Sequence, residues 1–281
     1  MRFRSTSLAA LLVIIGAWGV LRAQRTFQGP PSQNPPRPFK EYPAAEYVDF
    51  PLPPDWQAKT EWTRARLHYS STRRRRGGLD LNWTIDYPRS DRHLLEGVRR
   101  LTRIDTRSVE QVVDLDGEDD VYNWPMMYAV EVGYWRLSDN EAAQLRDFID
   151  RGGFLMVDDF HSTYEWAGFM ASMTKVFPDR QVEDLPNSDP IFHTLYDLEQ
   201  RFQVPGAQYL YSGRTYEKDE NGRPEHWRSI RDDKGRIIVA ICHNMDLGDA
   251  WEWSDDPRYD EKFAGLAYRI AMNYFIYDLS H

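Results

Sequence analysis

The sequence predicts an α/β protein, a three-layer sandwich in which a mostly parallel central sheet lies between two layers of helices. Residues 154–157 and 236–242 form apolar runs typical of strands that are buried on both faces. Amphipathic helical patterns precede and follow the first run, and a long one ends the chain. Strands that alternate with helices in this way build parallel sheets covered by helices, and this predicts the fold class.

The elements of the first half follow from about residue 58, where the folded domain is expected to begin. Residues 64–69 alternate polar and apolar side chains, as a first strand does. Ser90-Asp91 is a suitable N-cap for a helix whose apolar face consists of Leu94, Leu95, Val98 and Leu101. Residues 112–115 and 126–132 are the next predicted strands.

A helix, a strand and a second helix are predicted around the run at 154–157. Ser138 and Glu141 have the spacing of a capping box, in which each side chain bonds the backbone amide of the other. The glycine pair at 152–153 suits the left-handed turn that ends this helix before the strand. A second capping-box spacing, at 162–165, predicts that another helix begins just after the strand.

The second half is expected to be less regular. The helix that follows the first apolar run should end at Pro178, and residues 179–235 are predicted to be irregular apart from one short apolar helix at 191–198. The second apolar run then leads into a polar and aromatic loop at 243–253. An apolar stripe predicts a final helix over 259–278.

The N-terminal residues have the pattern of an export signal. Basic residues precede an apolar stretch at 8–20, and Ala23 is a small residue at a suitable cleavage point. Residues 1–23 are therefore a signal peptide or an uncleaved membrane anchor, and residues 24–57 are a proline-rich extended tether that wraps the single domain at 58–281. We expect export to the periplasm or cell envelope, with membrane contact only through the uncleaved N-terminal segment.

Composition excludes some partners. The net charge is −9, which argues against nucleic acid as the main partner, and the four arginines at 73–76 suit either a solvated basic loop or an anion contact. The single Cys242 cannot form an internal disulfide.

Three loops, at 71–91, 158–165 and 243–253, should meet at the carboxyl edge of the sheet, where α/β proteins bind ligands. Asp158 and Asp159 point in opposite directions on their strand, so at most one should face a cleft while the other caps the helix that follows or pairs with a base. Together with His161 they are the candidate catalytic residues, as general acid and base or as metal ligands.

A metal centre is an alternative to a cofactor-free site. His161, His243 and Asp246 offer ligands that suit several divalent metals, with His243 and Asp246 as the metal candidates. Their spacing matches no strong metal motif. The sequence otherwise predicts no cofactor.

Aromatic residues suggest a saccharide ligand. Flat rings beside carboxylates and amides hold sugar rings, which suits an exported protein. The alternative is that Trp251 and Trp253 pin the loop onto the domain. The candidate rim and ligand-binding residues are Trp83, Tyr87, Arg89, Trp124, Asn244, Asp246, Trp251 and Trp253.

Residues 60–280 resemble the bacterial family called domain of unknown function 4159. The resemblance is carried by Trp83, Asp86-Tyr87-Pro88, Asp91, the stretch 152–159, the stretch 244–252, Gly265 and the stretch 273–277. It implies the flavodoxin-like fold of class I glutamine amidotransferases, and an envelope location, rather than a reaction. Those enzymes need a Gly-x-Cys-x-Gly turn, which this chain lacks. Cys242 and His243 should also face opposite sides of their strand, so we expect no glutaminase activity and a core position for Cys242.

Three function hypotheses follow. The first is an exported envelope module that binds a saccharide or a protein partner. The second is a carboxylate- or metal-dependent hydrolase that uses the loops at 158–161 and 243–246. The third is a structural subunit of an envelope complex.

Overall fold

The computed structural model describes residues 34–47, 50–73 and 82–281. The predicted signal peptide or anchor, the first third of the tether and most of the arginine run lie outside these residues. Within the described ranges, no helix is both long and apolar enough to cross a membrane.

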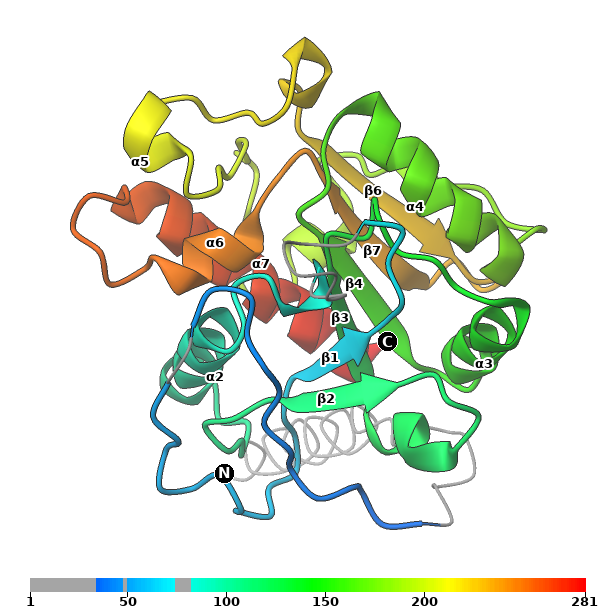
Figure 1. The fold of residues 1–281 in the computed structure, drawn as a ribbon. Helices are drawn as coiled ribbons and strands as arrows, with labels where there is room; N and C mark the ends of the chain where they lie inside the picture. Colours follow the sequence, from blue (N-terminus) through cyan, green and yellow to red (C-terminus); the bar gives the residue numbers. More distant parts are fainter. Residues whose placement is uncertain (1–33, 48–49, 74–81) are drawn as a thin grey trace, which may run out of the picture.

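A seven-stranded sheet, with strand order β2-β1-β3-β4-β7-β6-β5, forms the centre of the molecule (Figure 1). The first five strands in this order are parallel, and β6 and β5 are antiparallel to their neighbours. This confirms a mostly parallel sheet, with an order consistent with a flavodoxin-like α/β fold. The strands are β1 (Ala65–His68), β2 (Gln111–Asp114), β3 (Met126–Val130), β4 (Phe154–Asp158), β5 (Glu183–Asp184), β6 (His226–Arg231) and β7 (Ile237–His243).

Helices cover both faces of the sheet (Figure 1). Alternate residues of β3 point to opposite faces, so Met126 and Tyr128 join one core while Met127 and Ala129 join the other. The first core lies under α2 (Arg89–Leu101), α6 (Leu247–Glu252) and α7 (Glu261–Ser280). The second lies under α3 (Asp139–Asp150) and α4 (Ser162–Val176).

The predicted ends of α3 are confirmed. Ser138 and Glu141 form the capping box, and the amide of Gly153 donates to the carbonyl of Phe148 while Gly152 adopts a φ of 110°. This turn delivers the chain directly into β4. The second capping box is wrong in detail: α4 begins where predicted, but Ser162 does not cap it, and the Glu165 carboxylate accepts the amide of His161 instead.

The structure adds elements to the segments predicted to be irregular. Strand β6 lies within 179–235, where its register is set by pairing with β7 rather than by its own sequence pattern. The short apolar helix predicted at 191–198 is a single turn of 3-10 helix, and the loop at 243–253 contains α6. The remaining short elements are η1 (Asn82–Thr84), η2 (Asp119–Asn123), η3 (Pro190–Phe192), α5 (Tyr209–Ser212) and η4 (Glu220–Gly222).

The described residues of the proline-rich stretch lie extended against the domain. They are called here the N-terminal segment (residues 34–47 and 50–57). Asp55 accepts hydrogen bonds from the amide and hydroxyl of Ser108, and Glu41 pairs with Arg92 of α2. The hydroxyl of Tyr47 donates to the carboxylate of Glu252 at the end of α6. The segment therefore reaches the carboxyl edge of the sheet.

Candidate functional site: an acidic cleft

The carboxyl ends of β1, β3, β4 and β7 open into a cleft of about 430 Å³. Asp86 from the loop after β1, Asp159 after β4 and Asp246 after β7 all line it. The three loops expected to meet at this edge therefore do meet. Two of these loops, 158–165 and 243–253, are joined by hydrogen bonds. The amide of Asp159 donates to the carbonyl of Met245, and the amide of Ser162 donates to the side-chain oxygen of Asn244.

The cleft is strongly acidic. Of the described residues that line it, eight carry carboxylates and two carry cationic groups, Arg89 and Lys218. Burial raises the pKa of Asp86, Asp159 and Asp246 well above the ordinary carboxyl value, and repulsion among the carboxylates raises it further. The eight acids are Glu46, Asp86, Glu131, Asp159, Glu217, Asp246, Asp249 and Glu252.

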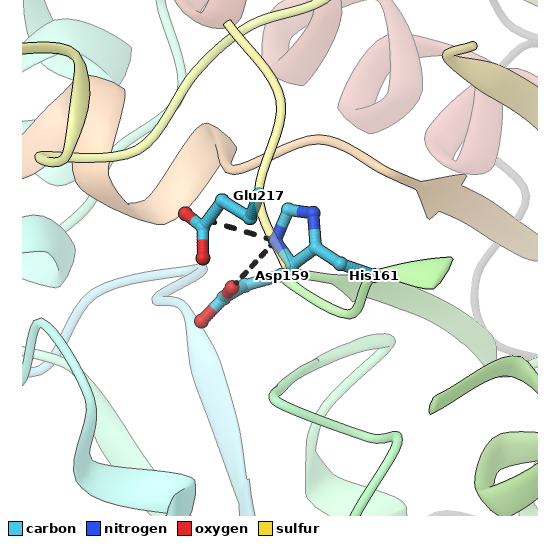
Figure 2. Close-up of side chains that lie close together, drawn as sticks. All are labelled: Asp159, His161 and Glu217. Atoms are coloured by element: carbon cyan, nitrogen blue, oxygen red, sulfur yellow. Dashed lines mark hydrogen bonds and ion pairs between the residues drawn. The ribbon is translucent and has the colours of Figure 1, made fainter. Parts of the chain in front are cut away.

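Asp159 and Glu217 line one side of the cleft, and Figure 2 shows that the side chain of His161 meets both of them. Nε2 of His161 lies 3.1 Å from Oδ1 of Asp159 and 3.9 Å from Oε1 of Glu217. One ligand atom of each residue lies within 4.8 Å of the other two. Because burial lowers the pKa of His161, its ring is neutral near pH 7 and has the form that binds metals.

A second set of acids surrounds Asp86. Its carboxylate lies within 4.8 Å of those of Asp246 and Asp249, and it belongs to a further set of the same dimension with Glu46 and Glu252. Asp86 is 1% exposed, and its Oδ2 has no hydrogen-bond partner among the described residues. A buried carboxylate oxygen in this state is unfavourable unless a cation or donor reaches it.

Asp158, by contrast, has a structural position. Its Oδ2 accepts the amides of Leu247 at 2.7 Å and Gly248 at 3.0 Å, at the start of α6, and the hydroxyl of Tyr128 at 3.2 Å. Burial raises its pKa to about 7. Of the two adjacent acids, Asp159 lines the cleft, as expected for one of the pair, whereas Asp158 binds the first amides of α6 and does not cap α4, the helix that follows it.

His243, a predicted metal ligand, lies outside the group of Asp159, His161 and Glu217. Nη1 of Arg228 donates to its Nδ1 at 3.2 Å, and its Nε2 lies 3.2 Å from the carbonyl of Ser162. Both ring nitrogens are thus engaged, and among the described residues His243 belongs to no group that could hold a metal. The structure does not bring His243 and Asp246 together.

A family model, Domain of unknown function (DUF4159), matches residues 63–279. The chain belongs to this family. No curated protein matches the chain in sequence. The family match covers every strand of the sheet and every acid of the cleft except Glu46.

The aromatic rim predicted for this DUF4159 domain does not form. Trp83, Tyr87 and Trp251 are at most 3% exposed and pack in the two cores, and Trp124 is also buried. For Trp251 the structure supports the alternative, that this residue pins its loop onto the domain. Its ring packs against Tyr128 of β3 and so fixes α6 to the sheet. Trp253 does line the cleft, with the Arg89 guanidinium over its ring.

Two expected ligand-binding residues have supporting positions in the DUF4159 domain. Asn244 is fully buried, and its amide donates to the carbonyls of Asn221 and Pro224 while its oxygen accepts the amide of Ser162. Arg89 lines the cleft and pairs with Asp255. Asn244 therefore fixes the loops that carry the acids.

Buried arginines support the floor of the cleft. Asp91 pairs with Nε of Arg64 at 3.1 Å and with Nη2 of Arg66 at 2.8 Å, and all three side chains are at most 3% exposed. Arg66 also donates to the carbonyls of Trp83 and Ile85. This network holds the loop that carries Asp86.

Sequence reasoning missed most of the acids. Glu131 directly follows β3, and its place at a strand end was a usable signal. Asp249 and Glu252 follow Asp246 at intervals of three residues, which places them on one face once α6 is known. Glu46 and Glu217, with its neighbour Lys218, lie in segments without local periodicity, so only the tertiary structure reveals them.

Proposed function

We propose that this protein binds a divalent transition-metal ion at Asp159, His161 and Glu217 and uses it to hydrolyse a ligand of the cell envelope. The observation that carries the proposal is the convergence of these three side chains, from two distant parts of the chain, within 4.8 Å in a cleft rich in negative charge. One neutral imidazole and two carboxylates suit manganese, iron or zinc and leave coordination positions open.

The chemistry that such an ion supplies is activation of bound water near neutral pH. The chain's own residues provide the other requirements of a hydrolase. As long as no cation occupies the acids around Asp86, burial and the neighbouring Asp249 raise the pKa of Glu252 to about 9, so Glu252 then holds a proton near pH 7 that it can donate. Lys218 pairs with Glu165 at 3.3 Å and offers a positive charge at the cleft wall.

The nature of the ligand is also part of the proposal. A saccharide remains our choice, with Trp253 as the aromatic surface and Arg89 beside it. The burial of Trp83, Tyr87 and Trp251 leaves too little aromatic surface for a module that works by stacking alone. This favours hydrolysis over simple binding.

We further propose that the fold is amidotransferase-like but without glutaminase activity, and that the protein is exported to the periplasm or envelope. The order of the five parallel strands supports the first point. Cys242 is completely buried in β7, and burial raises the pKa of its thiol, which opposes a nucleophilic role. The export pattern of residues 1–23 supports the second point.

Elemental analysis of the purified protein, equilibrated with Mn²⁺ or Zn²⁺ and freed of unbound metal, tests the metal site. We expect about one transition-metal ion per chain, lost in Asp159→Asn and in His161→Ala. His243→Gln is the matched control, because this histidine is also buried near the carboxyl ends of the strands but belongs to no group among the described residues that could hold a metal. Absence of metal from the parent, or equal metal in all variants, would reject the site.

A further inference from the structure

We propose a second cation site in the same cleft, made only of oxygen ligands from Asp86, Asp246 and Asp249 and selective for calcium. Each residue offers one carboxylate oxygen, and these atoms lie within 4.8 Å of one another. No nitrogen ligand belongs to this set, so it suits a hard cation rather than a transition metal. The site does not depend on the transition-metal site proposed above.

The unpaired oxygen of Asp86 points to a ligand independently of the cluster itself. Oδ2 of Asp86 is buried and has no hydrogen-bond partner among the residues described. Asp86 lines the cleft, and its Oδ2 lies near Gly248, beside Oδ1 of Asp246. The backbone of Asp86 has a left-handed conformation, with a φ of 60°, that residues other than glycine rarely adopt. A cation would supply the missing partner.

Two glycines leave room for the carboxylates to converge. A methyl group on Gly248 would lie 2.2 Å from Oδ2 of Asp86, and one on Gly206 would lie 2.5 Å from Oδ2 of Asp246. Both positions therefore need to lack a side chain. The Gly206 methyl would also lie 2.5 Å from Oε1 of Glu217, which places the two cation sites side by side. Adjacent cations are a common arrangement in hydrolases.

Further carboxylates favour calcium over magnesium. Asp86 also groups with Glu46 of the N-terminal segment and Glu252 of α6, again within 4.8 Å. Calcium accepts six to eight oxygen ligands in flexible geometry, whereas magnesium keeps several waters and binds few carboxylates. The four carboxyl groups of Glu46, Asp246, Asp249 and Glu252 around the shared Asp86 are better suited to the larger ion.

Calorimetric titration of the purified protein with CaCl₂, MgCl₂ and MnCl₂ tests this site. We expect Asp86→Asn to weaken calcium binding at least tenfold and to leave one manganese ion bound. His161→Ala should lose the manganese ion and bind calcium as tightly as the parent does. Asparagine tolerates the left-handed backbone at position 86, so the variant should fold. Asp249→Asn provides a second test of the same set, and the exposed Asp233→Asn is the matched control.

The results for the two sites are separable. A parent protein that binds calcium but no manganese, or manganese binding that is unchanged in His161→Ala, would contradict the transition-metal site and leave the calcium site standing. Absence of calcium binding, tighter binding of magnesium than of calcium, or calcium binding that is unchanged in both Asp86→Asn and Asp249→Asn would overturn the calcium site.

Discussion

Residues with a left-handed backbone gather around the acidic cleft. Asp86, Glu131 and Asp159 have φ values of 60°, 49° and 51°, and all three line it. Asn244, with a φ of 64°, holds the loops beneath. Each such residue costs roughly 1 to 3 kcal/mol and persists only where its surroundings enforce it. The fold therefore maintains the cleft at an energetic cost, which is common at functional sites.

His243 makes a testable contribution to acid sensitivity. Burial, together with the charge of Arg228, lowers its pKa to about 3, whereas an unfolded chain has the ordinary value of about 6.5. As the pH falls, His243 therefore binds a proton in the unfolded chain before it does so in the folded protein. Its contribution to the free energy of unfolding is complete above pH 6.5 and is lost as the pH falls toward 3. Between pH 7 and pH 5 this loss should be about 2 kcal/mol.

The substitution His243→Gln isolates this effect, because glutamine can still accept the hydrogen bond from Arg228 and does not titrate. Urea unfolding at both pH values should show that the variant loses about 2 kcal/mol less than the parent. Equal losses in the two proteins would show that His243 is not the group responsible.

At single residues, prediction from the sequence succeeded where a side chain follows a recognisable strand. Asp159 and His161 follow β4 within three residues, so the carboxyl-edge argument placed both at this edge, where they meet Glu217 and where Asp159 lines the cleft. It failed for Trp83 and Trp251, because aromatic residues near a loop pack inward as readily as outward. Prediction from the sequence could not find Glu46, because the position of this residue depends on long-range packing and no local pattern indicates it.

Among the elements, the two capping-box sequences behave differently and allow a matched comparison. Ser138 caps α3 through the amide of Glu141, whereas Ser162 leaves α4 without a side-chain cap. We expect Ser138→Ala to lower the free energy of unfolding by about 1 kcal/mol and Ser162→Ala to change it by less than half of that. Chemical unfolding of the two variants measures the difference, and an equal effect of both would contradict the assignment of the caps.

Buried parallel strands and capped helices were predictable because their signals are local. Strands β4 and β7 are continuous apolar runs, and α3 has its cap and its terminal glycine in sequence. Strand β6 was not predictable, because its mixed sequence takes its conformation from the edge of β7. Helix α6 was missed because it has only six residues, too few for a helical period to show.

At the scale of the whole molecule, the N-terminal segment and the cleft should be coupled. Glu46 belongs to the acidic set around Asp86, so a cation bound there would hold the segment in place. We expect calcium to slow tryptic cleavage after the exposed Lys40 several-fold, as followed by mass spectrometry.

Two substitutions in the same segment separate the cause from general stabilisation. Glu46→Gln should remove the protection by calcium, whereas Glu41→Gln, which alters only the contact with Arg92, should retain it. Protection that persists in Glu46→Gln would show that the cation and the segment act independently.

The contact between Tyr47 and Glu252 joins residues 205 positions apart. A ribosome therefore makes Glu46 and Tyr47 long before it makes the last acids of the same cleft. A chain that stops before Asp246 lacks Asp246, Asp249 and Glu252 and cannot form the complete acidic cleft. Cation binding at Asp86, Asp246 and Asp249 would therefore report that translation has passed α6 and that the loop after β1 has met it.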